Sequence, residues 1–573
     1  MKALCLLCLL CGLKPTATAL DREAFTFTRY DLDVRVEPEQ QRLGVRGKIS
    51  LRNGSDSAQK SLVLQISSTL SWRSIQIEGK PAEFISQTYA SDIDHTGALT
   101  EAIVNLPHPV APKQTIALEI GYEGIIPQDT TRLTRIGVPA DVAKHSDWDQ
   151  ISRSFTGVRG IGYVTWYPIA TEAVSLSERN SVVEAAGRWK HRETQSEMKV
   201  KFSHSGEAPA DLPSLYCNGE GQPVGYEQMS RAYEGQSECK FRNLSSHVPL
   251  FVIGNYHAVD HPQVNVSYLL DHKSHAEDYA LATEETAPFV NKWFGDHRER
   301  PDLKAEALEL PDSVAAPFES GNILLMPLDG NDTTSLLSAV QQLTHIAFPS
   351  PRAWIHDGLA RYAQVNFLQE KEGRDAAIEY LRNHRQSLIE SEKLAAAETD
   401  QAARSLINAD DEFYIQSKAM NVWWMLRDTV GDTALSAALH NYKSEDDKAP
   451  AYIQKLIEAQ AHRDLEWFFD DWVYRDRGLP EFHVVSVYPR ELLNGGYMVT
   501  VTVENSGQAG AEVPVTLKMA NGERSERMLV PAKSSASVRI ACPSFPQQAV
   551  VNDGSVPESD VSNNVYKIES SAH

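Results

Sequence analysis

Short runs of alternating hydrophobic and polar residues fill the first part of the chain, from Phe25 to about His257. Clear runs cover residues 30–36, 47–51 and 116–120, and polar residues, glycine and proline separate them. Alternation with a period of two is typical of strands that bury one face, and frequent turns favour antiparallel pairing. We therefore predict a β-rich region over residues 20–257, built as one large module or two small ones.

The hydrophobic period changes near Ala276, where apolar residues begin to recur every three or four positions. This spacing predicts helices. We expect helices over residues 275–294, 334–348, 358–370, 374–389, 417–430, 433–440 and 450–459, and strands over residues 305–310 and 323–326. Residues 258–478 should thus form a mixed, mainly helical domain.

Alternation returns after Gly478-Leu479-Pro480. The new runs cover residues 481–487, 497–504, 513–519, 526–530 and 537–541. Short strands at such regular spacing are typical of a β-sandwich. The patterning as a whole predicts a multidomain α+β protein in which residues 479–573 form an immunoglobulin-like C-terminal sandwich.

The first nineteen residues have the organisation of a signal peptide. Lys2 supplies a minimal positive region, residues 4–13 are apolar but too few to span a bilayer, and Ala17-Thr18-Ala19 is a small-residue cleavage site. We expect the mature protein to start near Leu20 and to reside outside the cytoplasm, in the periplasm or as a secreted protein.

Cysteine content adds one structural expectation. After the predicted cleavage site the chain keeps Cys217, Cys239 and Cys542. An odd number in an oxidising compartment implies one disulfide and one spare thiol. Cys217 and Cys239 are the expected pair, and closing that short loop would stabilise the fold by roughly 3 kcal/mol in the chain-entropy model.

The charge balance excludes two classes of partner. The chain has 55 Lys and Arg against 77 Asp and Glu, a formal net charge of −22 in 573 residues. Such an excess of negative charge argues against binding to nucleic acids and to anionic membrane surfaces. We also expect no membrane span, because no stretch beyond the signal peptide is long and apolar enough. The sequence gives no indication of an oligomeric state.

The residues Gln341-Gln342-Leu343-Thr344-His345 lie in a predicted helix and have the spacing of the H-E-x-x-H motif. In that motif two histidines at i and i+4 hold zinc, and the glutamate takes a proton from the zinc-bound water. Here Gln341 replaces the first ligand, and its amide binds zinc poorly. Gln342 replaces the general base and cannot accept a proton at ordinary pH. Only the second histidine, His345, remains.

Four further segments give this motif a context, and together they resemble the aminopeptidase N family of zinc metallopeptidases, in the gluzincin group. The resemblance covers roughly residues 25–480. The segments are Lys292-Trp293-Phe294-Gly295, Ala316-Pro317-Phe318-Glu319-Ser320-Gly321, Trp354-Ile355-His356-Asp357-Gly358-Leu359-Ala360-Arg361-Tyr362, and Tyr414 followed by Lys418-Ala419.

The resemblance implies a thermolysin-like catalytic domain and a role for each matched residue. Glu319 falls on the glutamate that grips the free amine of the substrate. His345 and Asp357 fall on the second and third zinc ligands. Tyr414 falls on the tyrosine that stabilises the oxyanion, although it stands four positions before Lys418 where the family has two.

Several departures from the family pattern weaken the expected metal site. Asp357 replaces a glutamate and is one methylene shorter, Ser320 replaces an asparagine, and the connector from His345 to Asp357 is short. One histidine, one aspartate and the Gln341 amide make a poor zinc site. We therefore expect no bound metal, or at most weakly bound zinc.

Each matched residue also has an ordinary structural interpretation. His345 can be a buried histidine that is hydrogen-bonded to Asp357, since the two survivors of a lost metal site can satisfy each other. Asp357 can instead form an i,i+4 ion pair with Arg361. Glu319 can be a solvated carboxylate at a strand edge, and Tyr414 can serve only in packing.

Three functions are compatible with these observations. The first, which the missing base favours, is a pseudopeptidase that keeps a cleft and binds peptides or protein N-termini without hydrolysing them. The second is an active metallopeptidase with an altered metal site, in which His345 and Asp357 are joined by a third ligand. His356 is available for that role, but we expect its side chain to point elsewhere. The third is a cell-envelope scaffold that acts through its β domains.

Overall fold

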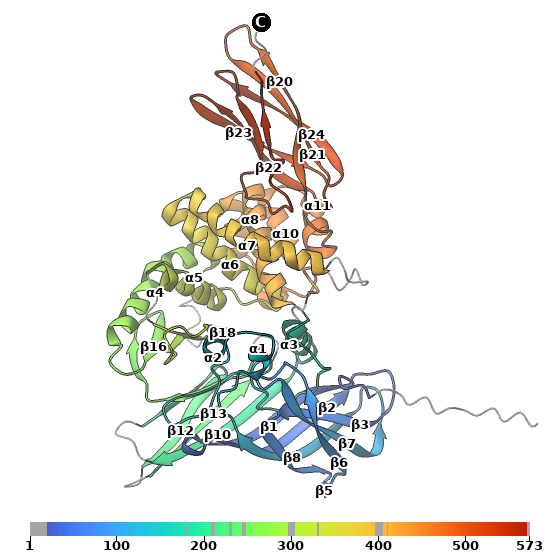
Figure 1. Ribbon diagram of the computed structural model, residues 1–573, viewed down its shortest axis with the longest axis vertical. Coiled ribbons are helices and arrows are strands. Elements are labelled where there is room, and N and C mark those ends of the chain that lie inside the picture. The colour runs from blue at the N-terminus through green and yellow to red at the C-terminus, as the bar shows by residue number, and fades with distance from the viewer. Residues whose placement is uncertain are drawn as a thin grey trace, which may run out of the picture.

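The computed structural model describes residues 20–178, 181–207, 212–228, 232–242, 244, 248–295, 304–328, 332–395, 405–409 and 411–569. The predicted signal peptide lies outside these residues. Figure 1 shows three parts along the long axis of the molecule: β-sheets of the N-terminal region at one end, helices in the middle, and C-terminal sheets at the other end. The chain is thus a multidomain α+β protein with a β-rich N-terminal region and a helical part, as predicted.

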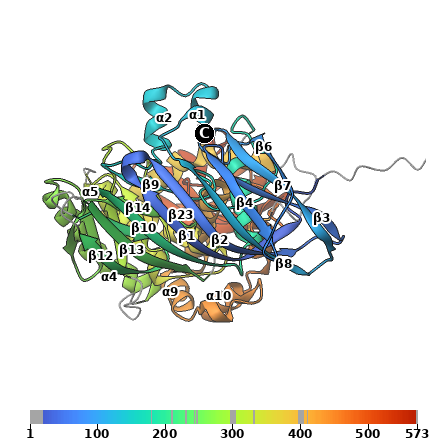
Figure 2. The same ribbon diagram turned by 90° about the horizontal axis from the view of Figure 1, so that it is seen from below.

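The N-terminal region is built on an eight-stranded sheet of order β12-β13-β10-β1-β2-β8-β4-β5, and several of its strands lie side by side in Figure 2. Two three-stranded sheets, β3-β7-β6 and β11-β14-β9, accompany it. The strands are β1 (Phe25–Glu37), β2 (Arg42–Asn53), β3 (Gln59–Ser67), β4 (Leu70–Ile77), β5 (Lys80–Pro81), β6 (Phe84–Ala90), β7 (Ala98–Val110), β8 (Thr115–Ile125), β9 (Thr156–Val158), β10 (Glu197–Glu207), β11 (Ser214–Cys217), β12 (Glu220–Gln228), β13 (Ala232–Phe241) and β14 (Phe251–Gly254).

The alternating pattern predicts the strands of this region, but it predicts neither the parallel pairing of β1 with β10 nor three short helices. In β1, Leu32, Val34 and Val36 are buried while the residues between them face solvent. The pairing of β1 with β10, however, is parallel. A parallel pair needs a long connection, which here includes three helices that the sequence patterning did not predict. They are α1 (Thr131–Arg135), α2 (Ala140–Ser146) and α3 (Ser181–Arg192).

The predicted disulfide is present. Cys217 at the end of β11 is bonded to Cys239 in β13, so the bridge ties a small sheet to the large one. Cys542 is free and buried. The expectation of one pair and one spare thiol is therefore confirmed.

The middle of the chain combines a five-stranded sheet of order β15-β16-β17-β19-β18 with helices. The strands are β15 (His257–Asp260), β16 (Val264–Tyr268), β17 (Ala305–Glu309), β18 (Phe318–Ser320) and β19 (Ile323–Met326). The helices are α4 (Lys273–Phe294), α5 (Asp332–Ala347), α6 (Ala353–Glu372), α7 (Arg374–Ala395), α8 (Glu412–Val430), α9 (Asp432–His440), α10 (Tyr452–Ala461) and α11 (Glu466–Phe469), and a π-helical turn, Asp470–Tyr474, follows α11. Among the described residues, no helix is long and apolar enough to cross a membrane.

The C-terminal strands form two sheets, β20-β21-β24 and β23-β22-β25-β26. Their bounds are β20 (Phe482–Glu491), β21 (Tyr497–Asn505), β22 (Ala511–Met519), β23 (Gly522–Val530), β24 (Ser534–Cys542), β25 (Gln548–Val551) and β26 (Val565–Lys567). Their buried residues belong to the same hydrophobic core as the helices, whereas the N-terminal region has a core of its own. A small third cluster, which includes Trp148, Phe155 and Leu308, lies where the N-terminal region meets the middle sheet.

Candidate functional site

Helices α5 and α6 carry most of the predicted site residues. In α5 one face is buried through apolar residues at helical spacing, namely Leu336, Ala339, Val340, Leu343 and Ile346. The helix ends at Ala347, just before Phe348-Pro349, because the residue before a proline disfavours helical geometry. A second proline, Pro351, precedes the start of α6 at Ala353. This short connector brings the end of α5 next to the first turns of α6.

Gln341 and His345 are one turn apart in α5, and both contact Glu319 in β18. His345 Nδ1 lies 2.8 Å from Glu319 Oε1, and Gln341 Nε2 donates to Glu319 Oε2 at 2.7 Å. The Gln341 carbonyl oxygen accepts from Nε2 of Gln364 in α6 at 3.2 Å. Both ends of the Gln341 amide are therefore engaged, and Glu319 holds the two α5 side chains together.

Gln342 faces a different direction from its neighbour. Its side chain is fully buried, and its Oε1 accepts from the Tyr279 hydroxyl at 3.0 Å. Its Nε2 donates to the carbonyl oxygens of Glu306 at 3.0 Å and Asn322 at 3.3 Å. The residue at the general-base position thus joins α5 to α4 and to the middle sheet.

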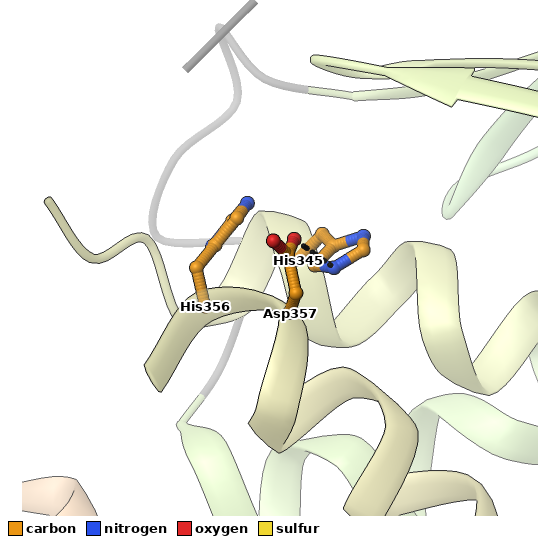
Figure 3. A group of neighbouring side chains, drawn as sticks. All are labelled: His345, His356 and Asp357. Carbon is orange, nitrogen blue, oxygen red and sulfur yellow. Dashed lines mark ion pairs between the residues drawn. The ribbon is translucent and has the colours of Figure 1, made fainter. Parts of the chain in front are cut away.

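Asp357 and His356 approach His345 from α6 (Figure 3). Asp357 Oδ1 lies 3.6 Å from His345 Nε2. The ring of His356 stacks on that of His345, with centroids 4.5 Å apart and planes at 29°. The expectation that His356 points elsewhere is wrong. Because α6 starts at Ala353, its first turns place both His356 and Asp357 beside the end of α5.

The alternative pairing of Asp357 with Arg361 does not form. Arg361 donates from Nε and Nη2 to the side-chain oxygen of Gln416, at 3.3 and 3.1 Å, and from Nη1 to that of Gln364. Asp357 keeps its ion pair with His345. Its side chain is 25% exposed, against 12% for His345 and 10% for Glu319, so Asp357 is the most accessible of the three.

The electrostatics of the cluster fix its charge state. Burial alone would lower the pKa of His345, but the carboxylates of Glu319 and Asp357 outweigh it and raise the pKa to about 10. Burial and the neighbouring His345 lower the pKa of His356 to about 4. Burial would raise the pKa of Asp357, but its pair with His345 lowers it. Without a metal, His345 is an imidazolium between two carboxylates and His356 is neutral.

Tyr414 is not part of this cluster, contrary to the oxyanion role that the resemblance implies. Its hydroxyl donates to Asp476 and, at 3.5 Å, to Glu392. The same two carboxylates bind Lys418, whose ammonium is fully buried. Burial raises the pKa of Tyr414 well above its ordinary value. The tyrosine therefore belongs to a buried polar network that joins α8 to α7 and to the segment leading into the C-terminal sheets.

The ligand positions of the zinc family do not fit zinc in this chain. They are occupied by Gln341, His345 and Asp357. An amide is a weak zinc ligand, and this one is hydrogen-bonded at both ends. His356 is the donor that the family pattern does not contain.

Comparison with known proteins supports the fold alone. No family model and no curated protein sequence matches the chain. Aminopeptidase A of Legionella pneumophila, solved in complex with aspartic acid, is similar at 10% identity and a TM-score of 0.58, over 94% of this chain and 60% of that chain. A mutant M1 zinc metallopeptidase of Deinococcus radiodurans, solved with a Tyr-Ser-Ala substrate, matches at 15% identity and a TM-score of 0.48, over 80% and 96% of the two chains. The chain thus has an aminopeptidase fold.

Sequence reasoning missed one contributor to the site and misplaced another. Gln364, whose amide fixes the orientation of Gln341, lies outside the motif segments. His356 is expected to point elsewhere because it neighbours Asp357 on a helix, yet its ring stacks on that of His345.

Proposed function

We propose that this protein is an extracytoplasmic, peptide-binding homologue of the aminopeptidases that does not hydrolyse its ligand. The observation that carries the proposal is the chemistry and the hydrogen bonding of the Gln342 side chain. At the position of the general base it is an amide, and its oxygen and nitrogen are both used in a buried network with Tyr279 and two backbone carbonyls. Loss of a general base typically lowers the rate of a reaction ~10²–10⁴-fold.

Glu319 is the residue that we propose to bind the peptide. Each of its carboxylate oxygens accepts one hydrogen bond from the protein, from His345 or Gln341. A carboxylate oxygen can accept more than one, so capacity remains for the ammonium group of a peptide N-terminus. The aspartic acid in the L. pneumophila aminopeptidase A structure is a ligand with such an amine.

We propose that a cavity beside the segment that leads into β18 takes the rest of a ligand. It has a volume of about 250 Å³ and lies between α2 and the connection from β17 to β18, and Glu319 is not among its lining residues. Its lining combines aromatic, apolar and polar groups from both regions, namely Gln128, Lys144, His145, Trp148, Gln150, Phe155, Leu310, Pro311, Asp312 and Ala315. Such a mixture is typical of sites that bind small ligands at domain junctions.

Peptide binding can be measured by fluorescence anisotropy with labelled peptides that have either a free or an acetylated N-terminus. We expect the free form to bind and the acetylated form to bind at least tenfold more weakly. Glu319→Gln should weaken binding of the free form by about 10–100-fold, because a hydrogen bond to a charged group contributes roughly 1.5–3 kcal/mol. Glu285→Gln, at an exposed glutamate paired with Lys371, is the matched control and should have no effect.

Hydrolysis is tested separately with an aminoacyl reporter substrate. We expect purified wild-type protein to give no chelator-sensitive cleavage, and Gln342→Glu alone to give none either, because Gln341 still occupies a ligand position. Chelator-sensitive cleavage by the wild type would overturn the non-hydrolytic part of the proposal. Equal affinity for free and acetylated peptides would overturn the role of Glu319.

A further inference from the structure

We propose that His345, His356 and Asp357 form a binding site for one divalent transition-metal ion, in which His356 supplies the ligand that Gln341 does not. The inference goes beyond the proposed function, since it stands whether or not the protein binds peptides. It starts from the geometry in Figure 3, where the three side chains converge from the end of α5 and the start of α6. One potential ligand atom from each lies within 4.8 Å of the other two.

The orientation of the His345 ring supports the site. Glu319 is a hydrogen-bond acceptor, so Nδ1 of His345 is the donor in their 2.8 Å contact. The nitrogen that remains for a metal is Nε2, which is buried and has no hydrogen-bond partner. In many proteins a metal-binding histidine is oriented by a carboxylate that accepts a hydrogen bond from the ring nitrogen that does not bind the metal.

His356 repeats this arrangement with a backbone oxygen. Its Nδ1 lies 3.3 Å from the carbonyl oxygen of Phe348, which can only accept. This leaves Nε2 as the nitrogen that could bind a metal. In both histidines Nδ1 is hydrogen-bonded to an oxygen, and Nε2 is the nitrogen proposed to bind the metal.

Distance and charge also suit an ion. His345 Nε2 and Asp357 Oδ1 are 3.6 Å apart, too far for a good hydrogen bond. Two ligands of a tetrahedral zinc ion at ~2.0–2.1 Å are roughly 3.3 Å apart, so this pair would need little movement. The His356 ligand atom lies within 4.8 Å of the other two and would move closer to complete the site. A divalent ion would displace the proton from His345 Nε2 to solvent, and the carboxylates of Asp357 and Glu319 would balance its charge.

The ligand chemistry defines the class of ion. Two imidazoles and one carboxylate suit Zn²⁺, Co²⁺ and other divalent transition metals, whereas Mg²⁺ and Ca²⁺ prefer oxygen ligands. Gln342 remains turned into the core, so the site would hold a metal without the base that the family places beside it.

Metal content of the purified mature chain tests the proposal. Protein stripped with chelator, loaded with Zn²⁺ or Co²⁺ and desalted should retain about one ion per chain by elemental analysis. His345→Ala and His356→Ala should each lower the affinity at least 100-fold. His384→Ala, at a half-buried histidine of α7 outside the cluster, should retain the ion. Gln341→Ala should lower the affinity less than tenfold, because the Gln341 side chain bonds Glu319 and Gln364 and is not one of the proposed ligands.

The absorption spectrum of bound Co²⁺ tests whether His356 is a ligand without relying on loss of binding. His356→Cys should retain Co²⁺ and add the charge-transfer absorption of a thiolate ligand, while circular dichroism shows that the variant is folded.

Fewer than about 0.1 ions per wild-type chain after loading would overturn the proposal. Loss of metal in Gln341→Ala but not in His356→Ala would also overturn it, since the ion would then use the positions of the zinc family. Peptide binding measured on the same stripped samples separates failure here from failure of the proposed function.

Discussion

Lys418 is a fully buried ammonium between two carboxylates. Its Nζ contacts Glu392 of α7 and lies 2.9 Å from Oδ1 of Asp476, and the Tyr414 hydroxyl donates to the same pair. Taking these charges out of water is costly, and only their close pairing compensates. Burial raises the pKa of Glu392 and by itself would lower that of Lys418, but the two carboxylates keep the pKa of Lys418 above its ordinary value.

Lys418→Met should therefore destabilise the protein by about 3–5 kcal/mol, because it leaves two carboxylates buried without a counter-charge. Urea unfolding at pH 7, followed by circular dichroism, measures the change. Lys292→Met, which removes an exposed pair with Glu370, is the control and should change the free energy of unfolding by less than about 1 kcal/mol. Adding Glu392→Gln and Asp476→Asn to Lys418→Met should recover much of the loss. An unchanged stability in Lys418→Met would contradict the importance of the network.

At the scale of residues, the sequence predicts which side chains meet only where helix geometry or the family resemblance places them together. Gln341 and His345 share a helix face by spacing, and the structure brings both to Glu319. Tyr414 could not be placed, because its partners Glu392 and Asp476 are 22 and 62 positions away in the sequence. No helical or strand periodicity encodes such contacts.

At the scale of elements, α6 and α8 pack closely at Gly358, the residue after Asp357. A Cβ atom at Gly358 would lie 2.4 Å from the Cβ of Ala419 and 3.2 Å from Nε1 of Trp423. Only glycine allows this approach without movement of one helix. The close contact thus fixes the position of the first turns of α6, which carry His356 and Asp357.

Gly358→Ala should separate the two helices and destabilise the protein by about 1–3 kcal/mol, as overpacking typically does. The same variant should weaken binding of Co²⁺, because its proposed ligands move with α6. Ala419→Gly removes the opposing methyl group, so the double variant Gly358→Ala/Ala419→Gly should bind Co²⁺ more tightly than the single one. Thermal unfolding and Co²⁺ titration measure both effects. A double variant no better than Gly358→Ala would show that the clash lies elsewhere.

The type of the helices in the middle of the chain followed from periodicity, but the first turns of α6 and α8 did not. The start of α7 at Arg374 is as predicted, whereas α6 starts at Ala353 rather than at residue 358 and α8 at Glu412 rather than at residue 417. First turns escape the pattern because they contain polar residues that satisfy free backbone groups. In α8, for example, the Asp411 side chain accepts from the backbone of Phe413 and Tyr414.

At the scale of the whole molecule, the helices and the C-terminal sheets share one hydrophobic core, while the N-terminal region has another. Polar contacts reinforce the shared part. Trp472 Nε1 donates to the Gly510 carbonyl oxygen at 2.8 Å, and Arg374 pairs with Asp428 at 2.7 Å and Asp553 at 3.1 Å. Hydrophobic patterning predicted separate helical and sheet regions, but it could not show that they share a core, because burial against a distant element leaves no separate periodicity.

This sharing bears on the scaffold hypothesis. Deleting the C-terminal sheets would expose apolar surface of the helical part and would destabilise it. Loss of partner binding in such a deletion would therefore not show that the sheets bind the partner. Substitutions on the exposed side of the sheets, such as Tyr488→Ser, where the side chain is 68% exposed, test that hypothesis without opening the core.

The shared core predicts how the protein opens. Amides of α6, α8, β21 and β22 should exchange hydrogen with one common free energy and one denaturant dependence, because breaking either part uncovers the other. Amides of β1, β2 and β10 should form a second group with its own free energy, since their core is separate. Hydrogen exchange followed by mass spectrometry over a series of low urea concentrations measures these values peptide by peptide. If the strands β21 and β22 opened at a lower free energy than α6 and α8, the C-terminal sheets would be an independent unit, and the shared burial would contribute little to cooperativity.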